Sequence, residues 1–175
     1  LEKDKKKMKK EIEKLLNSVA TITNNNTTNM NNINNSNVIV VNNYGKENTD
    51  YLSANYLKYL LNKPYGAIQD IIKNIHFHPK HPENHNVKIT NKKLPHALVW
   101  NDKIWETRSK KEVIEDLVDK GYMIMDTTNE NVEEDNKRYN KFQNNYEEKE
   151  SETKDCIEKD TELLLMNQTK KLDCD

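Results

Sequence analysis

Residues 97–118, which read ALVWNDKIWETRSKKEVIEDLV, contain two strand patterns followed by the start of a helix. The runs 97–100 and 103–107 are rich in strand-forming residues, and the Asn-Asp pair between them is typical of a tight hairpin turn. Ser109 begins the pattern Ser-x-x-Glu, a capping box that opens a helix. We therefore predict a hairpin that leads directly into a helix, which indicates an α+β fold.

Upstream of the hairpin, the sequence predicts two helices, a loop and a further strand. Ser53 can cap a helix that Pro64 ends, and a second helix covers about residues 65–77. Residues 78–86 contain two prolines, which exclude a continuing helix and predict a loop. Residues 87–90 follow as the first of three strand candidates.

The chain divides into four predicted parts. Residues 1–23 are expected to form a coiled coil, and residues 24–47 an Asn-rich stalk that ends in a β-strand. Residues 48–126 form an α+β head with two helices, a three-stranded antiparallel meander and a third helix. Residues 127–175 form an acidic tail whose apolar residues fall near helical spacing, with partial disorder as the alternative.

Residues 1–23 have the clearest periodicity in the chain. Their apolar residues recur at spacings of seven, four, three, four and three, which is the heptad pattern of a coiled coil. Lys5 is the one polar residue of this seam. A single amphipathic helix docked on its own domain is the alternative, but no neighbouring apolar face would receive the stripe. The seam consists of Leu1, Met8, Ile12, Leu15, Val19 and Ile22.

The segment between the coiled coil and the head is rich in Asn. Residues 24–37 cannot form a stable helix, because Asn and Thr are weak helix formers. A faint period of three, which includes Ile33, suits three chains around one axis, and a disordered linker is the alternative. Residues 37–43 predict a strand, and Gly45 predicts a turn with positive φ. Burial on both faces, against copies of the same segment, is expected for Val38, Ile39, Val40 and Val41.

The charge of the chain is nearly balanced, with 28 basic and 29 acidic residues and a net charge of −1. Lysine is in excess over residues 1–14 and acid over residues 127–175. A nucleic-acid-binding domain usually has a concentrated basic face, which neither the head nor the tail shows. The overuse of Asn and the near absence of Arg are typical of an AT-rich coding sequence, so they carry little functional information.

Several classes of protein are excluded by composition. No run of about 18 apolar residues is present, so we expect no transmembrane helix and no membrane partner. The two cysteines lie in the tail and make no disulfide framework, which favours a reducing compartment. Because the chain opens with Leu1, we expect it to be part of a longer protein.

The strongest candidate for chemistry is the stretch 76–85, which holds four of the five histidines. Imidazole is a good zinc ligand, but the prolines impose an irregular loop without the spacing of paired ligands. We interpret His76 as a cation at a helix C-terminus and His85 as a residue that hydrogen-bonds the backbone. A metal site, a structural loop and a partner-binding loop that includes His78, His81 and His85 remain open.

The hairpin carries two tryptophans, Trp100 and Trp105. Alternating strand residues of this size usually form the core of a small domain, and an exposed binding platform is the alternative. No pattern for nucleophilic catalysis is present, and three glycines in the whole chain cannot build a phosphate loop. The sequence therefore predicts no catalytic residue, no cofactor and no enzymatic activity.

Seven short motifs form a distinctive set: YGKEN at 44–48, IHF at 75–77, HPENHN at 81–86, ALVW at 97–100, KIW at 103–105, EVIEDL at 112–117 and LLLMN at 163–167. Together they resemble an uncharacterised module encoded by large DNA viruses of protists, of the mimivirus and iridovirus kind. The resemblance covers roughly residues 39–170. His78 departs from it, since the family usually has an Asn-like residue there.

The resemblance implies a module without enzymatic activity at the C-terminus of a protein, behind a zinc finger and a coiled coil. Any contact with nucleic acid would come from that preceding region. It also implies a place in the host cytoplasm or nucleus, at the viral factory, or in the virion.

Three functions follow as hypotheses. The first is a non-enzymatic oligomerisation and interaction module of a DNA-associated viral protein, a parallel homotrimer, with a dimer as the alternative, that presents several heads at once. The second is a structural component of a virion or fibre. The third is a metal-dependent enzyme that uses the histidine loop.

Overall fold

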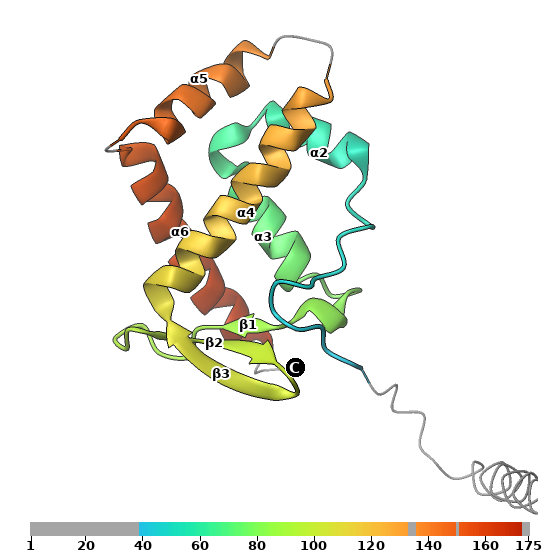
Figure 1. Ribbon diagram of the computed structural model, residues 1–175, viewed down its shortest axis with the longest axis vertical. Helices are drawn as coiled ribbons and strands as arrows, with labels where there is room; N and C mark the ends of the chain where they lie inside the picture. The colour runs from blue at the N-terminus through green and yellow to red at the C-terminus, as the bar shows by residue number, and fades with distance from the viewer. Residues whose placement is uncertain (1–38, 133–135, 150, 173–175) are drawn as a thin grey trace, which may run out of the picture. The chain divides into compact units, whose positions relative to one another are not determined.

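The computed structural model describes residues 39–132, 136–149 and 151–172, which belong to one compact unit that begins at Ile39. These residues form an α+β fold of two helices, a three-stranded antiparallel sheet and three further helices (Figure 1). The predicted coiled coil and most of the predicted stalk lie outside the described residues, including Met8, Ile12, Leu15, Val19, Ile22, Ile33 and Val38.

The first two helices begin where the sequence predicts. Helix α2 (Ala54–Leu61) is capped by Ser53, whose hydroxyl accepts a hydrogen bond from the Tyr56 amide at 3.2 Å. Helix α3 (Pro64–His76) opens with Pro64, because proline lacks the N–H that would be unpaired at that position. The isoleucine face expected for this helix is buried, and it consists of Ile68, Ile71, Ile72 and Ile75.

The sheet has the strand order β1 (Val87–Lys88), β2 (His96–Asn101), β3 (Ile104–Ser109), and both pairings are antiparallel. The hairpin turn lies one residue later than predicted. Its central residues are Asp102 and Lys103, with φ of 44° and 68°, while Asn101 remains paired in the strand. A two-residue hairpin turn of this type needs positive φ at both central positions.

The predicted strand over residues 37–43 is wrong for its described part. Residues 39–43 lack regular strand pairing, and the Asn42 amide donates to the Glu83 carbonyl of a loop at 2.7 Å. Ile39 and Val40 are 51% and 78% exposed in the single chain, while Val41 is half-buried. The segment therefore follows the loop rather than the edge of the sheet.

Helix α4 (Lys110–Glu130) connects the sheet to the tail. Ser109 caps it, accepting from the Glu112 amide at 3.4 Å as the capping box predicts. The helix continues past residue 126 into the region expected to be the tail. Gly121 allows close packing on α3, because a Cβ there would lie 2.9 Å from Cγ2 of Ile68.

The described part of the acidic tail is helical, and it completes the core. Helix α5 (Lys137–Glu147) buries Tyr139, Phe142 and Tyr146, and helix α6 (Glu152–Leu172) is 21 residues long. Helix α6 packs on α3, α4 and β1 (Figure 1). None of the described helices is long and apolar enough to cross a membrane.

Candidate functional site: the clamped arm

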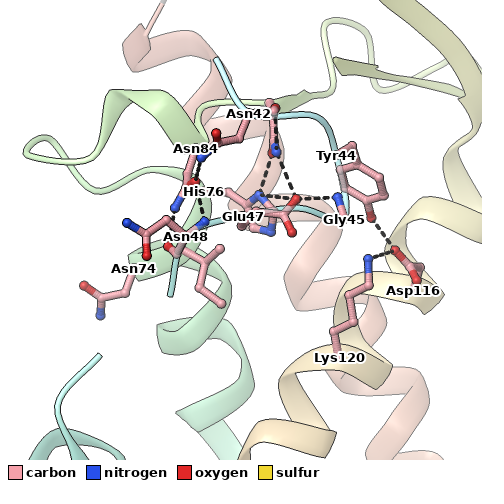
Figure 2. A network of polar contacts seen from close by, with 12 residues as sticks. Asn42, Tyr44, Gly45, Glu47, Asn48, Asn74, His76, Asn84, Asp116 and Lys120 are labelled. Atoms are coloured by element: carbon pink, nitrogen blue, oxygen red, sulfur yellow. Dashed lines mark hydrogen bonds and ion pairs between the residues drawn. The ribbon is translucent and has the colours of Figure 1, made fainter. Parts of the chain in front are cut away.

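The first described segment, residues 39–48, is held against the rest of the unit by polar contacts; we call it the arm (Figure 2). The Tyr44 amide donates to the carbonyl of Trp100 in β2 at 2.8 Å. The Asn43 side chain exchanges two hydrogen bonds of 3.1 Å with Asp102 in the hairpin turn. With the bond from Asn42 to Glu83, the backbone of the arm is fixed to a loop, a strand and a turn.

Asn84 ties two points of the arm together. Its side chain is fully buried, at the end of the short 3₁₀ helix Pro82–Asn84. Its Oδ1 accepts from Nδ2 of Asn42 at 2.9 Å and from the amide of Asn48 at 3.0 Å. Its Nδ2 donates to the Asn48 carbonyl at 2.7 Å. A buried amide must find such partners, and here the arm supplies them.

Asn86 links the arm to α3 through a short chain of side chains. Its Nδ2 donates to Oε1 of Glu47 at 2.9 Å and to the Asn42 carbonyl at 3.3 Å. Its Oδ1 lies 2.9 Å from Nδ1 of His76. Oε1 of Glu47 also accepts from the Gly45 amide at 2.7 Å. The result is a buried His–Asn–Glu series that joins helix, loop and arm.

Tyr44 and Gly45 turn the arm against α4. Gly45 has φ of 85°, the positive value predicted for this turn. The Tyr44 hydroxyl donates to Oδ2 of Asp116 at 2.7 Å, and the same oxygen accepts from Lys120 at 2.7 Å. Burial, followed by the hydrogen bond to Asp116, raises the pKa of the Tyr44 phenol well above its usual value. The phenol is therefore neutral and acts as a donor.

The histidine loop is held together by contacts of its own. His81 stacks on Tyr51 with ring centroids 3.5 Å apart, and its Nδ1 lies 3.0 Å from Oε1 of Glu83. Nε2 of His85 lies 3.1 Å from the carbonyl of His78, which confirms the expected bond to the backbone. Within the described residues, no group of three His, Cys, Asp or Glu side chains could hold a metal ion.

His76 departs from the prediction of a helix-terminal cation. It does end α3, but it is 4% exposed, and burial lowers the pKa of its imidazole despite the nearby Glu47 carboxylate. Burying a charged ring costs more free energy than the favourable interaction of a cation with the end of a helix supplies. The ring is therefore neutral near pH 7.

The two tryptophans lie outside the core, so the interpretation of both as core residues is wrong. Trp100 is half-buried and Trp105 is 36% exposed, and their rings meet edge to face at 5.4 Å. The ammonium of Lys88 lies 4.4 Å from the Trp105 ring centroid. They pair across the hairpin on the face of the sheet opposite Val99, which is buried. The alternative of an exposed platform remains a hypothesis.

The residues that hold the arm were not among those singled out from sequence. Asn84 and Asn86 belong to the HPENHN motif, but in a chain this rich in Asn two further asparagines stand out little. Glu47 and Asp116 belong to the YGKEN and EVIEDL motifs, but as single residues they look like ordinary surface acids. The available signal was local: two asparagines lie in an otherwise irregular loop beside two prolines, where the backbone needs side-chain partners.

Comparisons with known proteins identified no relative of this chain. No family model matches the sequence, and neither the curated proteins nor the solved structures contain a significant match.

Proposed function

We propose that the chain is a non-enzymatic oligomerisation and interaction module in which an N-terminal coiled coil gathers copies of the α+β head. The observation that carries the proposal is the clamped arm. Two fully buried asparagines, Asn84 and Asn86, form hydrogen bonds with the arm. The arm is the segment through which the head joins the preceding residues. A head on a flexible connection would not need its arm to be held in one arrangement.

A fixed joint matters for multivalent binding. When several heads are linked, the second binding event becomes intramolecular, and its effective concentration depends on how well the geometry of the link matches the target. The clamp restricts the directions in which a head can point relative to its arm. Heads gathered in this way can bind a repetitive target through contacts that are individually weak.

The exposed apolar residues of the arm support contact between copies. Ile39 and Val40 are β-branched and mostly exposed, and they belong to the last part of the predicted stalk. Burying such side chains releases roughly 25 cal/mol for each Å² of apolar surface removed from water. In an oligomer, the copies of this segment would cover one another.

The partner of the whole protein is proposed from the resemblance to viral modules behind a zinc finger. It suggests a DNA-associated factor that works at the viral factory, with nucleic acid bound by a region outside this chain. A virion or fibre component would use the same trimeric presentation, and it would be found in purified particles.

The coiled coil is tested by introducing charge into its seam. Leu15→Asp places a carboxylate in the apolar stripe, so we expect the mass by light scattering to fall from a multiple to that of one chain, 20.7 kDa. Asn17→Asp adds the same charge at an outward position and should keep the parent mass.

Two results would contradict the proposal. One is a parent chain that has the mass of a single folded polypeptide at micromolar concentration. The other is a Leu15→Asp variant that keeps the mass of the parent.

A further inference from the structure

A pocket of about 250 Å³ lies between α3, α4 and the arm. Its walls are mostly apolar and include Ile72 and Ile75 from α3 and Leu117 and Ile124 from α4. An apolar cavity of 150 Å³ holds one benzene ring, so this pocket has room for one substituted ring. Pockets with apolar walls and a few polar groups are where proteins bind small molecules.

The polar end of this pocket includes His76 from α3 and Glu47 from the arm, with Nδ1 of His76 4.0 Å from Oε1 of Glu47 (Figure 2). The orientation of Asn86 is fixed, because its Nδ2 faces Oε1 of Glu47 at 2.9 Å and a carboxylate can only accept. The opposite atom, Oδ1, therefore faces Nδ1 of His76 and accepts a hydrogen bond from its N–H. The neutral ring carries its proton on Nδ1, and Nε2 has a free lone pair.

Nε2 of His76 has no hydrogen-bond partner among the described residues, although the side chain is more than nine-tenths buried. In the described part of the chain, the polar side-chain atoms that are fully enclosed and lack a partner are Oε1 of Gln69 and Oγ1 of Thr161. Nε2 of His76 is not among them. The atom is therefore accessible to solvent, and His76 is one of the residues that line the pocket.

The other charged groups that line the pocket offer few free hydrogen-bond donors to a ligand. Oε1 of Glu47 accepts two bonds from the protein, and its carboxylate has none to give. The ammonium of Lys120 donates to Asp116 and lies 4.7 Å from the Tyr44 ring centroid, so it is already engaged. One carboxylate and one ammonium leave no excess charge of either sign.

We propose that this pocket binds a small neutral aromatic molecule that bears one hydrogen-bond donor, of the phenol class, with the donor on Nε2 of His76 and the ring between α3 and α4. This site is independent of the oligomerisation proposed above. It concerns the inside of one head, and its test does not depend on how many chains assemble.

The first test compares two probes of nearly equal shape on the full chain. p-Cresol carries the donor, and p-xylene has a methyl group in its place. We expect both to shift the methyl resonances of Ile72 and Ile75, and p-cresol to bind about fivefold more tightly because only it pairs Nε2. Equal or tighter binding of p-xylene, or no shift of these methyls by either probe, would overturn the proposal.

The second test observes the His76 ring itself. A ¹⁵N spectrum of the ring should show the proton on Nδ1 in the free protein, and p-cresol but not p-xylene should move the Nε2 resonance. A proton on Nε2 in the free protein would contradict the proposed acceptor.

The third test closes the pocket. Met123 lines it from α4 and is 65% exposed, so Met123→Trp can obstruct the opening without disturbing the core. We expect p-cresol affinity to fall at least tenfold, while Leu163→Trp, on exposed α6 surface, leaves it unchanged. If Met123→Trp fails to fold, Thr49→Trp obstructs the pocket from the residue that follows the arm. Parent affinity in a folded obstructed variant would refute the site.

Discussion

The two halves of helix α4 are held by different means. Its first half meets the arm through polar atoms, with Asp116 and Lys120 around the Tyr44 hydroxyl. Its second half meets α5 through rings: Tyr122 stacks on Tyr146 at 4.1 Å, and Phe142 contacts both. One helix thus joins a polar clamp to an aromatic cluster.

The difference teaches what each region contributes. Buried rings stabilise in proportion to the area they remove from water, with some freedom in how they pack. Buried amides stabilise little in net terms, but each demands its partners in one arrangement, because an unpaired buried polar group is costly. The aromatic cluster therefore supplies stability, and the clamp supplies a defined geometry.

The largest expected effect comes from the aromatic cluster. Phe142 is fully buried among tyrosines, so Phe142→Ala should lower the free energy of unfolding by about 3–5 kcal/mol. The change is measured by urea denaturation. Met123→Ala, at an exposed position of α4, serves as the control and should change it by less than about 0.5 kcal/mol. A similar loss in both variants would break the contrast between ring burial and surface.

The clamp should respond to the loss of one amide. Asn84→Ala leaves the Asn48 amide and carbonyl without their buried partner, so we expect a loss of about 2 kcal/mol. Hydrogen exchange should accelerate at the Asn48 amide, while amides of α5 stay protected. Asn144→Ala, which removes an exposed asparagine of α5, should leave both measurements unchanged. Unchanged exchange at Asn48 in the Asn84 variant would show that the clamp is held by something else.

The clamp should also weaken in mild acid. The folded state keeps His76 neutral because burial lowers its pKa, whereas the unfolded chain takes up a proton below about pH 6.5. The contribution of His76 to the free energy of unfolding is fully present above that pH. Below it, the free energy of unfolding falls by at most about 1.4 kcal/mol per pH unit for this one group. Glu47, Asp116 and Lys120 face the same region.

The contribution of His76 is isolated by comparing slopes. Urea midpoints measured between pH 7.5 and 5.5 should decline more steeply for the parent than for His76→Gln, which has no ring to titrate. Parallel slopes would assign the acid sensitivity to other groups.

The smallest effect is expected where a polar contact is shared. Tyr44→Phe removes the hydroxyl from Asp116, but Lys120 continues to pair that carboxylate at 2.7 Å. We expect a loss of about 1 kcal/mol in urea denaturation. Tyr59→Phe, at a residue 51% exposed, is the matched control. A loss as large as that of Phe142→Ala would erase the distinction between the two halves of α4.

Most of the secondary structure could be predicted because its signals are local. Ser53 and Ser109 cap helices as predicted, and the spacing of Tyr139, Phe142 and Tyr146 indicated a buried helix face. The described part of the strand expected at residues 37–43, residues 39–43, was mispredicted because a β-branched run shows propensity but not which backbone is free to pair with it. That information is tertiary.

The residues of the candidate site could not be predicted from the sequence, for a different reason. The value of Asn84 and Asn86 lies in burial and in partners about 40 residues away, such as Asn42 and Glu47. A biased composition makes such residues look ordinary. The histidines and tryptophans attracted notice by residue type, whereas two asparagines, Asn84 and Asn86, have fully buried side chains.

The way the arm is anchored determines how the head would bear tension. A pull on Ile39 reaches Asn42 and Tyr44, which are bonded to a loop, to the central strand β2 and to α4. Along the chain, the bond of Asn42 to the loop comes first, and the bonds of Tyr44 to β2 and α4 follow it. If the proposed assembly forms, tension between copies would therefore reach the sheet and α4 of each head through its arm.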